Sequence, residues 1–272
     1  MVTGFVHPGA MGASLAAACD SDRLWCGHGR SAATRTRAEA AGMEDVGSID
    51  VLVRRADVIV SVCPPASATA VARSISSAGF DGVYVDVNAV SPATAREIAK
   101  LFERFVDGGV VGPPVQKPGV TRLYLSGDAA AQVAQLWAGS PLEARVIDGG
   151  PGAASAVKVC FATWTKGSAA LLLAIRALAE AESVEDALLA EWSTSMPDLA
   201  GQSERAASTN APKAWRFAGE LDEIAESFAA HDLPDGFGRA ASDVYGRMSR
   251  FKNDSDVTLR EVIDALRHPG DS

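Results

Sequence analysis

The chain has 272 residues, of which 47% are hydrophobic and 22% charged, and its formal net charge is −9. This composition is typical of a soluble globular protein, and the length is sufficient for two domains. The acidic balance argues against a nucleic-acid partner, and no apolar run is long enough to span a membrane. No secretory leader is recognisable and the four cysteines lack metal-ligand spacing, so we expect a cytoplasmic protein without a metal site.

Short β-branched runs alternate with Ala-rich segments of helical period along the first 148 residues. The predicted strands are 2–6, 24–27, 57–62, 83–87, 105–107, 122–126 and 144–147. The predicted helices between them are 10–19, 32–41, 66–78, 92–103 and 129–138. This alternation is typical of an α/β fold with a doubly wound parallel sheet of the Rossmann type, covered by helices on both faces.

Glycine and proline at residues 149–152 interrupt the pattern, and every later segment resembles a helix rather than a strand. We therefore expect two domains, 1–150 and 151–272. The predicted helices of the second domain include a long one over 153–181, followed by 213–230 and 238–251. The sequence thus predicts a Rossmann domain followed by an all-α domain.

The first predicted strand leads into the segment HPGAMG, which precedes an Ala-rich helix. In this position Gly9 lets the backbone approach a pyrophosphate, and Gly12 lets the helix pack closely on the strand. The helix N-terminus adds amide donors and a positive potential. A tight turn without a ligand is the alternative, but the strand and helix pattern favours a dinucleotide site. The residues of this site are His7, Pro8, Gly9, Ala10, Met11 and Gly12.

The segment after the second predicted strand indicates which dinucleotide binds. An acidic residue there would bind the ribose 2′-hydroxyl of NAD, and the segment 27–37 contains none. It offers Arg30, Ser31, Arg35 and Arg37, which suit a 2′-phosphate through charge-assisted hydrogen bonds. We therefore expect NADP or NADPH, with a solvated basic helix start as the alternative interpretation.

Four motifs resemble those of the β-hydroxyacid dehydrogenases, the superfamily that includes 6-phosphogluconate and 3-hydroxyisobutyrate dehydrogenases. HPGAMG is similar to the family's GLGxMG, GRS at 29–31 to its NRT, and DVNAVSPATAR at 86–96 to its DxSTxSPxTxR; VCPP at 62–65 is the fourth. The resemblance covers nearly the whole chain and is greatest to a subgroup with the HPG turn and a C-terminal domain of unassigned function. It implies that Cys63, Pro64, Asn88 and Ala89 contact the cofactor; a small buried thiol is the alternative role for Cys63.

The resemblance also implies a substrate site. The family's DAPVSGG corresponds to residues 107–113, where Val111 replaces the serine that helps to bind a carboxylate. A valine donates no hydrogen bond, so the usual small 3-hydroxy acid is in doubt. The backbone amides of Gly108, Gly109 and Gly112 remain as expected substrate contacts, and a tight interdomain turn is the alternative role for these glycines.

The family's catalytic lysine matches Lys158, which lies at the border of an apolar helix face. Partial burial there would lower its pKa and suit it to exchange a proton with a substrate oxygen; an ordinary surface lysine is the alternative. The family's asparagine one turn later is Ala162 here, which leaves Thr165 as the polar residue near the Lys158 face. The family's KDL motif resembles AHDL at 230–233, which places His231 near the cofactor or, alternatively, at a helix end.

These features predict an NADP(H)-dependent oxidoreductase that moves a hydride between the nicotinamide and a small hydroxy- or keto-acid-like substrate. Lys158 is expected to act as general acid or base in a cleft between the domains. The missing serine and asparagine leave two alternatives, an imine or ketimine reductase and a catalytically degenerate NADP-binding sensor or scaffold. Because relatives in the superfamily commonly pair through their helical domains, we expect a homodimer.

Overall fold

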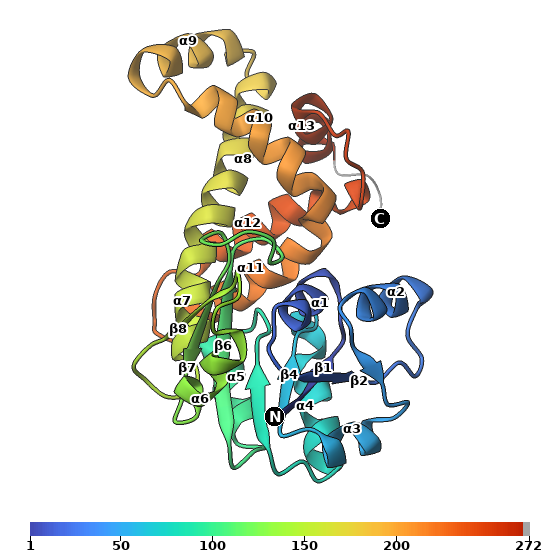
Figure 1. Cartoon of the computed structure of the whole chain (residues 1–272). Helices are drawn as coiled ribbons and strands as arrows, with labels where there is room; N and C mark the ends of the chain where they lie inside the picture. The colour runs from blue at the N-terminus through green and yellow to red at the C-terminus, as the bar shows by residue number, and fades with distance from the viewer. Residues whose placement is uncertain (269–272) are drawn as a thin grey trace. The chain divides into compact units, whose positions relative to one another are not determined.

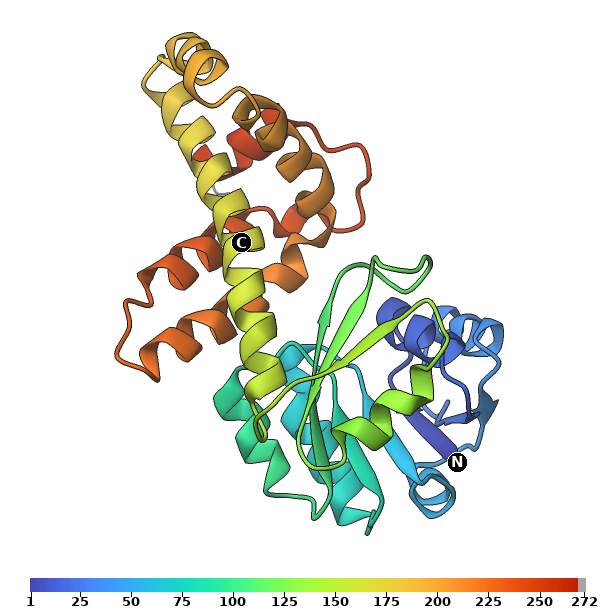
Figure 2. The ribbon, with the colours of Figure 1, turned by 60° about the vertical axis from the view of Figure 1, so that its left-hand side comes forward.

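The computed structural model describes residues 1–268, which divide into two compact units. The first unit is Met1–Val159 and contains every strand of the described chain. The second begins at Cys160, and all secondary-structure elements of its described residues are helices (Figures 1 and 2). The predicted order, a Rossmann domain and then an all-α region, is therefore confirmed.

The first unit is built on one sheet with the strand order β3-β2-β1-β4-β5-β6-β7-β8. Its strands are β1 (Val2–Val6), β2 (Asp22–Trp25), β3 (Glu44–Asp45), β4 (Val58–Ser61), β5 (Val83–Asp86), β6 (Phe105–Val111), β7 (Arg122–Ser126) and β8 (Glu143–Val146). All neighbouring strands run parallel except β6 and β7, which are antiparallel. The sequence predicted a parallel sheet throughout. The reversal follows from the helix-free connection between β6 and β7, because a parallel pair would need a longer crossover.

Two sets of helices cover the two faces of this sheet. The first set is α1 (Ala10–Ala17), α2 (Ala32–Ala40) and α6 (Ala130–Ala134), and the second is α3 (Ile49–Arg55), α4 (Ala68–Ser77) and α5 (Pro92–Ala99). Strand β4 illustrates the arrangement, because Val58 and Val60 join the first apolar cluster while Ile59 joins the second. Burial on both sides explains why the central strands are apolar along their whole length.

A long helical segment links the first unit to the second. It consists of α7 (Ala153–Ala162), one π-helical turn (Thr163–Gly167) and α8 (Ser168–Ala181), so the helix predicted over 153–181 is present with one wider turn. The boundary between the units falls inside α7. The second unit continues with α9 (Glu185–Ser195), α10 (Leu199–Asn210), α11 (Ala214–Ala229), α12 (Gly236–Arg247) and α13 (Leu259–Arg267). Helices α11 and α12 pack against each other as a hairpin (Figure 2).

Candidate functional site

The carboxyl end of β1 leads directly into the turn at residues 7–12. Gly9 is the N-cap of α1, and no side-chain hydrogen bond caps this helix. A Cβ on Gly9 would meet nothing of the described chain within 4 Å, whereas one on Gly12 would lie 3.2 Å from the His7 carbonyl oxygen. Gly9 therefore borders open space at the helix N-terminus, and Gly12 lets α1 pack against the turn. Both features fit a pyrophosphate.

His7 adopts a conformation that only glycine adopts readily. Its φ is 62°, and its carbonyl oxygen accepts a hydrogen bond from Gly9 N at 2.7 Å. Nδ1 of the ring is buried and has no hydrogen-bond partner among the described residues. Burial and the nearby Arg30 charge lower the pKa of His7 to about 4, so the ring is neutral near pH 7. A strained residue with an unpartnered nitrogen is a feature that a bound dinucleotide would explain.

The remaining residues of the turn serve its packing. Pro8 is buried, and its carbonyl oxygen accepts a long hydrogen bond from Arg37 Nε at 3.4 Å. Ala10 and Met11 form the first turn of α1, and Met11 packs against the first apolar cluster. The turn predicted from the sequence thus lies at a strand end and a helix start, where the two structural elements hold its backbone.

The carboxyl ends of β4 and β5 are joined by the buried side chain of Asn88. Its Oδ1 accepts a hydrogen bond from Cys63 N at 2.5 Å, and its Nδ2 donates to Ser61 Oγ at 3.1 Å and Asp86 Oδ2 at 2.9 Å. Asn88 therefore holds the segment of Cys63 and Pro64 in place, and its contact with a cofactor stays a prediction, as does that of the half-buried Ala89. Burial raises the pKa of Cys63 to about 12, which disfavours a thiolate role.

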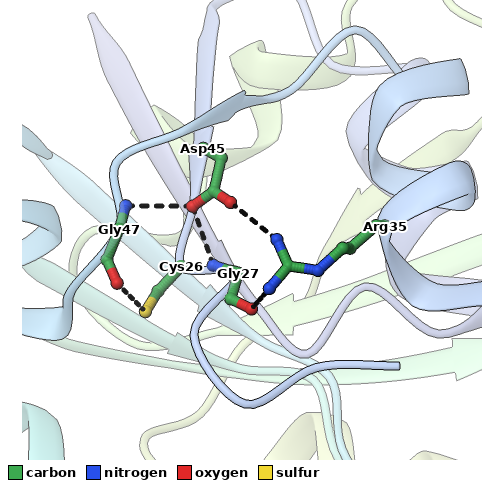
Figure 3. Close-up of polar contacts among 5 residues, drawn as sticks. All are labelled: Cys26, Gly27, Arg35, Asp45 and Gly47. Atoms are coloured by element: carbon green, nitrogen blue, oxygen red, sulfur yellow. Dashed lines mark hydrogen bonds and ion pairs between the residues drawn. The ribbon is translucent and has the colours of Figure 1, made fainter. Parts of the chain in front are cut away.

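The end of β2 is occupied by an acidic side chain that comes from another strand. Asp45, at the end of β3, lies beside β2, with Trp25 opposite it in the register. Its Oδ1 accepts hydrogen bonds from Gly27 N and Gly47 N, both at 2.9 Å (Figure 3). The sequence of segment 27–37 does not predict this carboxylate, because Asp45 lies 18 residues after Gly27 in a strand of only two residues.

The basic residues of segment 27–37 are held in different ways. Arg35 donates from Nη1 to Asp45 Oδ2 at 3.2 Å and from Nη2 to the Gly27 carbonyl oxygen at 2.5 Å (Figure 3). Arg37 donates to Thr34 Oγ1 at 3.1 Å. Ser31 caps α2 by accepting a hydrogen bond from Thr34 N at 3.3 Å. Two of the three predicted arginines therefore have protein partners close to the end of β2.

Arg30 differs from Arg35, because it forms no ion pair with any residue in the described part of the chain. Its positive charge adds to the effect of burial in lowering the pKa of His7, and it opposes the effect of burial, which raises the pKa of Cys63. The Arg30 charge is therefore felt both at the turn after β1 and after the end of β4. A cation in this position suits a phosphate group.

Strand β6 holds the first turns of α7 through a buried carboxylate. Asp107 is fully buried; its Oδ1 accepts from Ser155 Oγ at 2.6 Å and its Oδ2 from Ser155 N at 2.8 Å. Burial raises the pKa of Asp107, although the hydrogen bonds from Ser155 oppose the shift. Ser126 in β7 adds a second anchor, because its Oγ accepts a hydrogen bond from Ala154 N at 3.1 Å. Two strands thus fix the position of this helix.

Lys158 lies on α7 one turn beyond Ser155. Its Nζ donates a hydrogen bond to the Val110 carbonyl oxygen at 2.7 Å, and the side chain is half-buried. A Cβ on Gly109 would lie 2.5 Å from the Ala154 carbonyl oxygen and 3.1 Å from Lys158 Cβ. Glycine at 109 therefore allows α7 to approach β6 closely enough for the lysine amine to reach the carboxyl end of that strand.

The predicted substrate glycines lie in and just after β6. Gly108 and Gly109 are buried within the strand and paired with β7, and Val111 is also buried. Gly112 has a φ of 119°, which turns the chain out of β6. The structure thus explains these glycines by backbone packing, and their contact with a substrate stays a prediction.

Two further predicted site residues lie in the second unit. Thr165 is exposed, and its Oγ1 donates to the Phe161 carbonyl oxygen at 3.1 Å. His231 is exposed in the turn after α11, where its backbone N donates to Phe228 O at 3.0 Å. Within residues 1–268 no group of three or more His, Cys, Asp or Glu could hold a metal ion. None of the helices in this range combines the length and the hydrophobicity that a membrane span requires.

Comparisons with known proteins give one match to a domain family and one to an uncharacterized relative. Residues 179–248 match the model of a domain of unknown function, DUF1932. An uncharacterized 28.5 kDa protein of Methanothermus fervidus is 34% identical over 167 residues, which cover 60% of this chain and 64% of that protein. The match therefore spans slightly less than two thirds of this relative.

Solved structures match nearly the whole chain. The conserved protein MTH1747, of unknown function and structurally similar to 3-hydroxyacid dehydrogenases, has a TM-score of 0.71 at 25% identity, with 97% of this chain and 99% of that chain covered. A 3-hydroxyisobutyrate dehydrogenase of Mycobacterium tuberculosis has a TM-score of 0.69 at 19% identity, with 98% and 99% covered. A reductive aminase of Aspergillus terreus in complex with NADPH has a TM-score of 0.56 at 17% identity, with 97% and 99% covered.

The class of protein follows from the sheet order, the glycine turn after β1 and these matches. The chain has the fold of the β-hydroxyacid dehydrogenase-like proteins, and residues 179–248 match DUF1932. The resemblance inferred from HPGAMG and the other motifs is thereby confirmed.

Proposed function

We propose that this protein is a cytoplasmic NADP(H)-dependent oxidoreductase acting on a small hydroxy- or keto-acid-like substrate. The observation that carries the proposal is the position of the Lys158 amine, 2.7 Å from the Val110 carbonyl oxygen at the carboxyl end of β6. Ligands of open α/β sheets bind at the carboxyl ends of the strands, where β1 of this protein also supplies an open glycine turn. The similarity to 3-hydroxyacid dehydrogenases supports the same class of reaction.

The turn after β1 would hold the dinucleotide through its backbone. The amides at the start of α1 face the pyrophosphate, and Arg30 and Ser31 bind the 2′-phosphate of NADP(H). Arg30 supports NADP over NAD because no carboxylate of the described chain neutralises it in an ion pair. When bound, the nicotinamide ring supplies or accepts the hydride.

In this proposal Lys158 accepts and donates the proton of the substrate oxygen. In the oxidation direction its neutral amine accepts the proton of the substrate hydroxyl, and in the reduction direction its ammonium returns a proton to the substrate oxygen. The Val110 carbonyl oxygen accepts an N–H from either protonation state, so it orients Nζ throughout. The anchor of Asp107 and Ser155 keeps the helix that carries the lysine in position.

An imine or ketimine reductase is the second candidate. Val111 stands where the family has a serine that helps to bind a carboxylate, and Ala162 stands where it has an asparagine, so two polar groups of the family's site are missing. The structural similarity to a reductive aminase that binds NADPH favours the same candidate. A binding protein without catalytic activity is the third, and it is defined by NADPH binding without turnover.

Substrate screening with a lysine variant tests the proposal. NADPH consumption is measured with panels of keto acids, aldehydes and cyclic imines, and the reverse reaction with hydroxy acids and NADP⁺. Lys158→Met should lower kcat/KM for the best substrate by more than about a hundredfold, because it removes the proton donor and acceptor. Lys100→Met, which removes an exposed lysine paired with Glu97, is the control and should leave turnover unchanged. A Lys158→Met enzyme within tenfold of wild type would exclude the acid-base role.

We also propose that the second unit forms a homodimer. Leu171 and Leu178 of α8 are seven residues apart and are 63% and 62% exposed, and Trp164, in the π-helical turn before α8, is 75% exposed. A heptad of exposed apolar residues is the pattern of a helix that packs against another helix. Leu171→Glu should convert a dimer into a monomer in analytical ultracentrifugation. A wild-type protein that sediments as a monomer at tens of micromolar contradicts the dimer.

A further inference from the structure

The end of β2 carries an acidic group although the sequence of that segment contains none. The Asp45 carboxylate fills the space beside Gly27, because a Cβ on Gly27 would lie 2.1 Å from Asp45 Oδ2 and 2.9 Å from Arg35 Nη1. Glycine at 27 therefore permits the carboxylate and the guanidinium to meet at the end of β2 (Figure 3). In a dinucleotide-binding sheet this is the place where the adenosine ribose is recognised.

Both partners of this ion pair retain hydrogen-bonding capacity. A carboxylate has about four acceptor positions, and Asp45 uses three of them, for Gly27 N, Gly47 N and Arg35 Nη1. A guanidinium has five N–H donors, and the hydrogen bonds described for Arg35 engage one on each of two nitrogens. The two side chains are 36% and 45% exposed. A ligand can therefore reach an acceptor and a donor at the same position.

The role of this ion pair rests on the proposed NADP(H) dependence of the protein. We propose that the Asp45–Arg35 pair sets the ratio of NADPH to NADH affinity, with Asp45 accepting the ribose 2′-hydroxyl of NADH and Arg35 binding the 2′-phosphate of NADPH. Asp45 is thus the acidic residue of dinucleotide recognition, supplied by β3 instead of β2. Arg30 adds to the phosphate affinity, and Asp45 opposes it, so that NADH is bound as well.

The charge of Asp45 has opposite effects on the binding of the two dinucleotides. A 2′-phosphate is close to dianionic at pH 7, so a neighbouring carboxylate repels it. The amides of Gly47 and Gly27 and the Arg35 charge outweigh the effect of desolvation and lower the pKa of Asp45, which keeps the carboxylate ionised at neutral pH. Removing this charge should therefore strengthen NADPH binding and weaken NADH binding. A carboxylate that only holds the loop in place would change both affinities in the same direction.

The decisive variant is Asp45→Asn, which keeps an oxygen for the amides of Gly27 and Gly47 and removes the charge. Titration of the full-length protein with each dinucleotide, followed by fluorescence, gives the two Kd values. We expect the Kd for NADPH to fall about fivefold and the Kd for NADH to rise about tenfold. Arg35→Gln should raise the Kd for NADPH about tenfold and change that for NADH by less than threefold.

Glu44→Gln is the matched control, because Glu44 is the neighbouring acid of β3 and pairs with Arg55 at 2.6 Å. Successive strand residues point to opposite faces, so this variant removes the same charge away from Gly27 and should leave the ratio of Kd values within twofold. The inference is overturned if Asp45→Asn moves both Kd values in the same direction, or if Arg35→Gln leaves NADPH binding unchanged. If wild type binds neither dinucleotide, the proposed function itself fails.

Discussion

Two carboxylates of the first unit both accept hydrogen bonds from backbone amides, but one is partly exposed and the other is buried. The Asp45 side chain is 36% exposed at the end of β3 and forms an ion pair with Arg35. Asp107 is fully buried in β6 and bonds to the backbone N and the hydroxyl of Ser155. The pKa of Asp45 is lowered, whereas burial raises that of Asp107.

The difference separates recognition from positioning. An exposed ion pair contributes little to stability and can exchange a protein partner for a ligand. A buried carboxylate with well-placed hydrogen bonds has no such freedom, because any unpaired group would remain inside the protein. We therefore assign the Asp45 region to dinucleotide choice and the Asp107 region to fixing the helix that carries Lys158. Substitutions in the two regions should have effects of different size and kind.

The largest effect is expected where α7 touches β6. Gly109→Val places a Cβ 2.5 Å from the Ala154 carbonyl oxygen, a backbone atom that cannot move without displacing α7. We expect a loss of about 3 kcal/mol or more in the free energy of unfolding, measured with urea. Gly150→Ala is the control, since a Cβ there meets nothing of the described chain within 4 Å. Equal stability of Gly109→Val and wild type would show that this contact is absent.

Removal of the two carboxylates should rank them in the order of their burial. Asp107→Ala leaves the backbone N and hydroxyl of Ser155 unpaired in the interior, and we expect a loss of about 2 to 3 kcal/mol. Asp45→Ala removes half-exposed contacts, and we expect a loss of about 1 kcal/mol or less. Urea unfolding of both variants measures the difference. A greater loss for Asp45→Ala than for Asp107→Ala contradicts the distinction between the two regions.

The dependence of stability on pH provides a smaller but more specific comparison. Burial raises the pKa of Asp86, beside Asp107 in the register of β5 and β6, from 3.8 to about 7. The folded state therefore holds this proton more tightly than the unfolded state, and stability should fall as pH rises from about 4 to about 7. Asp45 behaves in the opposite way, because its lowered pKa stabilises the fold above about pH 4 and this contribution is lost in acid.

Two variants resolve these opposite signs. The difference in the free energy of unfolding between wild type and Asp86→Asn should change steadily between pH 4.5 and 7.5, since only wild type carries a titratable carboxyl group at position 86. The difference between wild type and Asp45→Asn should stay constant over the same range and shrink below pH 4. A constant difference for Asp86→Asn would mean that its carboxyl group titrates at an ordinary pKa in the folded protein.

Much of the fold of the first unit could be predicted from periodicity and punctuation. The strands 2–6 and 122–126 were predicted with the bounds that the structure shows, and most helices differ by a few residues. Helix α3 was missed because IDVLVRR is rich in β-branched residues and shows no clear helical period. Its N-cap, Ser48, accepts a hydrogen bond from Val51 N at 3.3 Å and was the available signal.

The candidate site was predictable where its residues lie in one motif and not where strands bring distant residues together. HPGAMG directly follows the end of β1 and contains the turn and the start of α1, so the position of the turn follows from the local sequence. Asp45 reaches Gly27 only through the pairing of β2 with β3, which sequence spacing does not specify. The hydrogen bonds of Asp107 to Ser155 join residues 48 positions apart and depend on the same kind of long-range packing.

Direct measurement of dinucleotide binding tests the central claim of a nicotinamide-dependent enzyme most simply. Wild-type protein should bind NADPH with a Kd in the micromolar range, should bind NADH more weakly, and should show a higher Tm in the presence of NADPH. Arg30→Ala should raise the Kd for NADPH by at least about tenfold through loss of a charge-assisted phosphate contact. Absence of both binding and thermal stabilisation at millimolar NADPH and NADH would contradict the account.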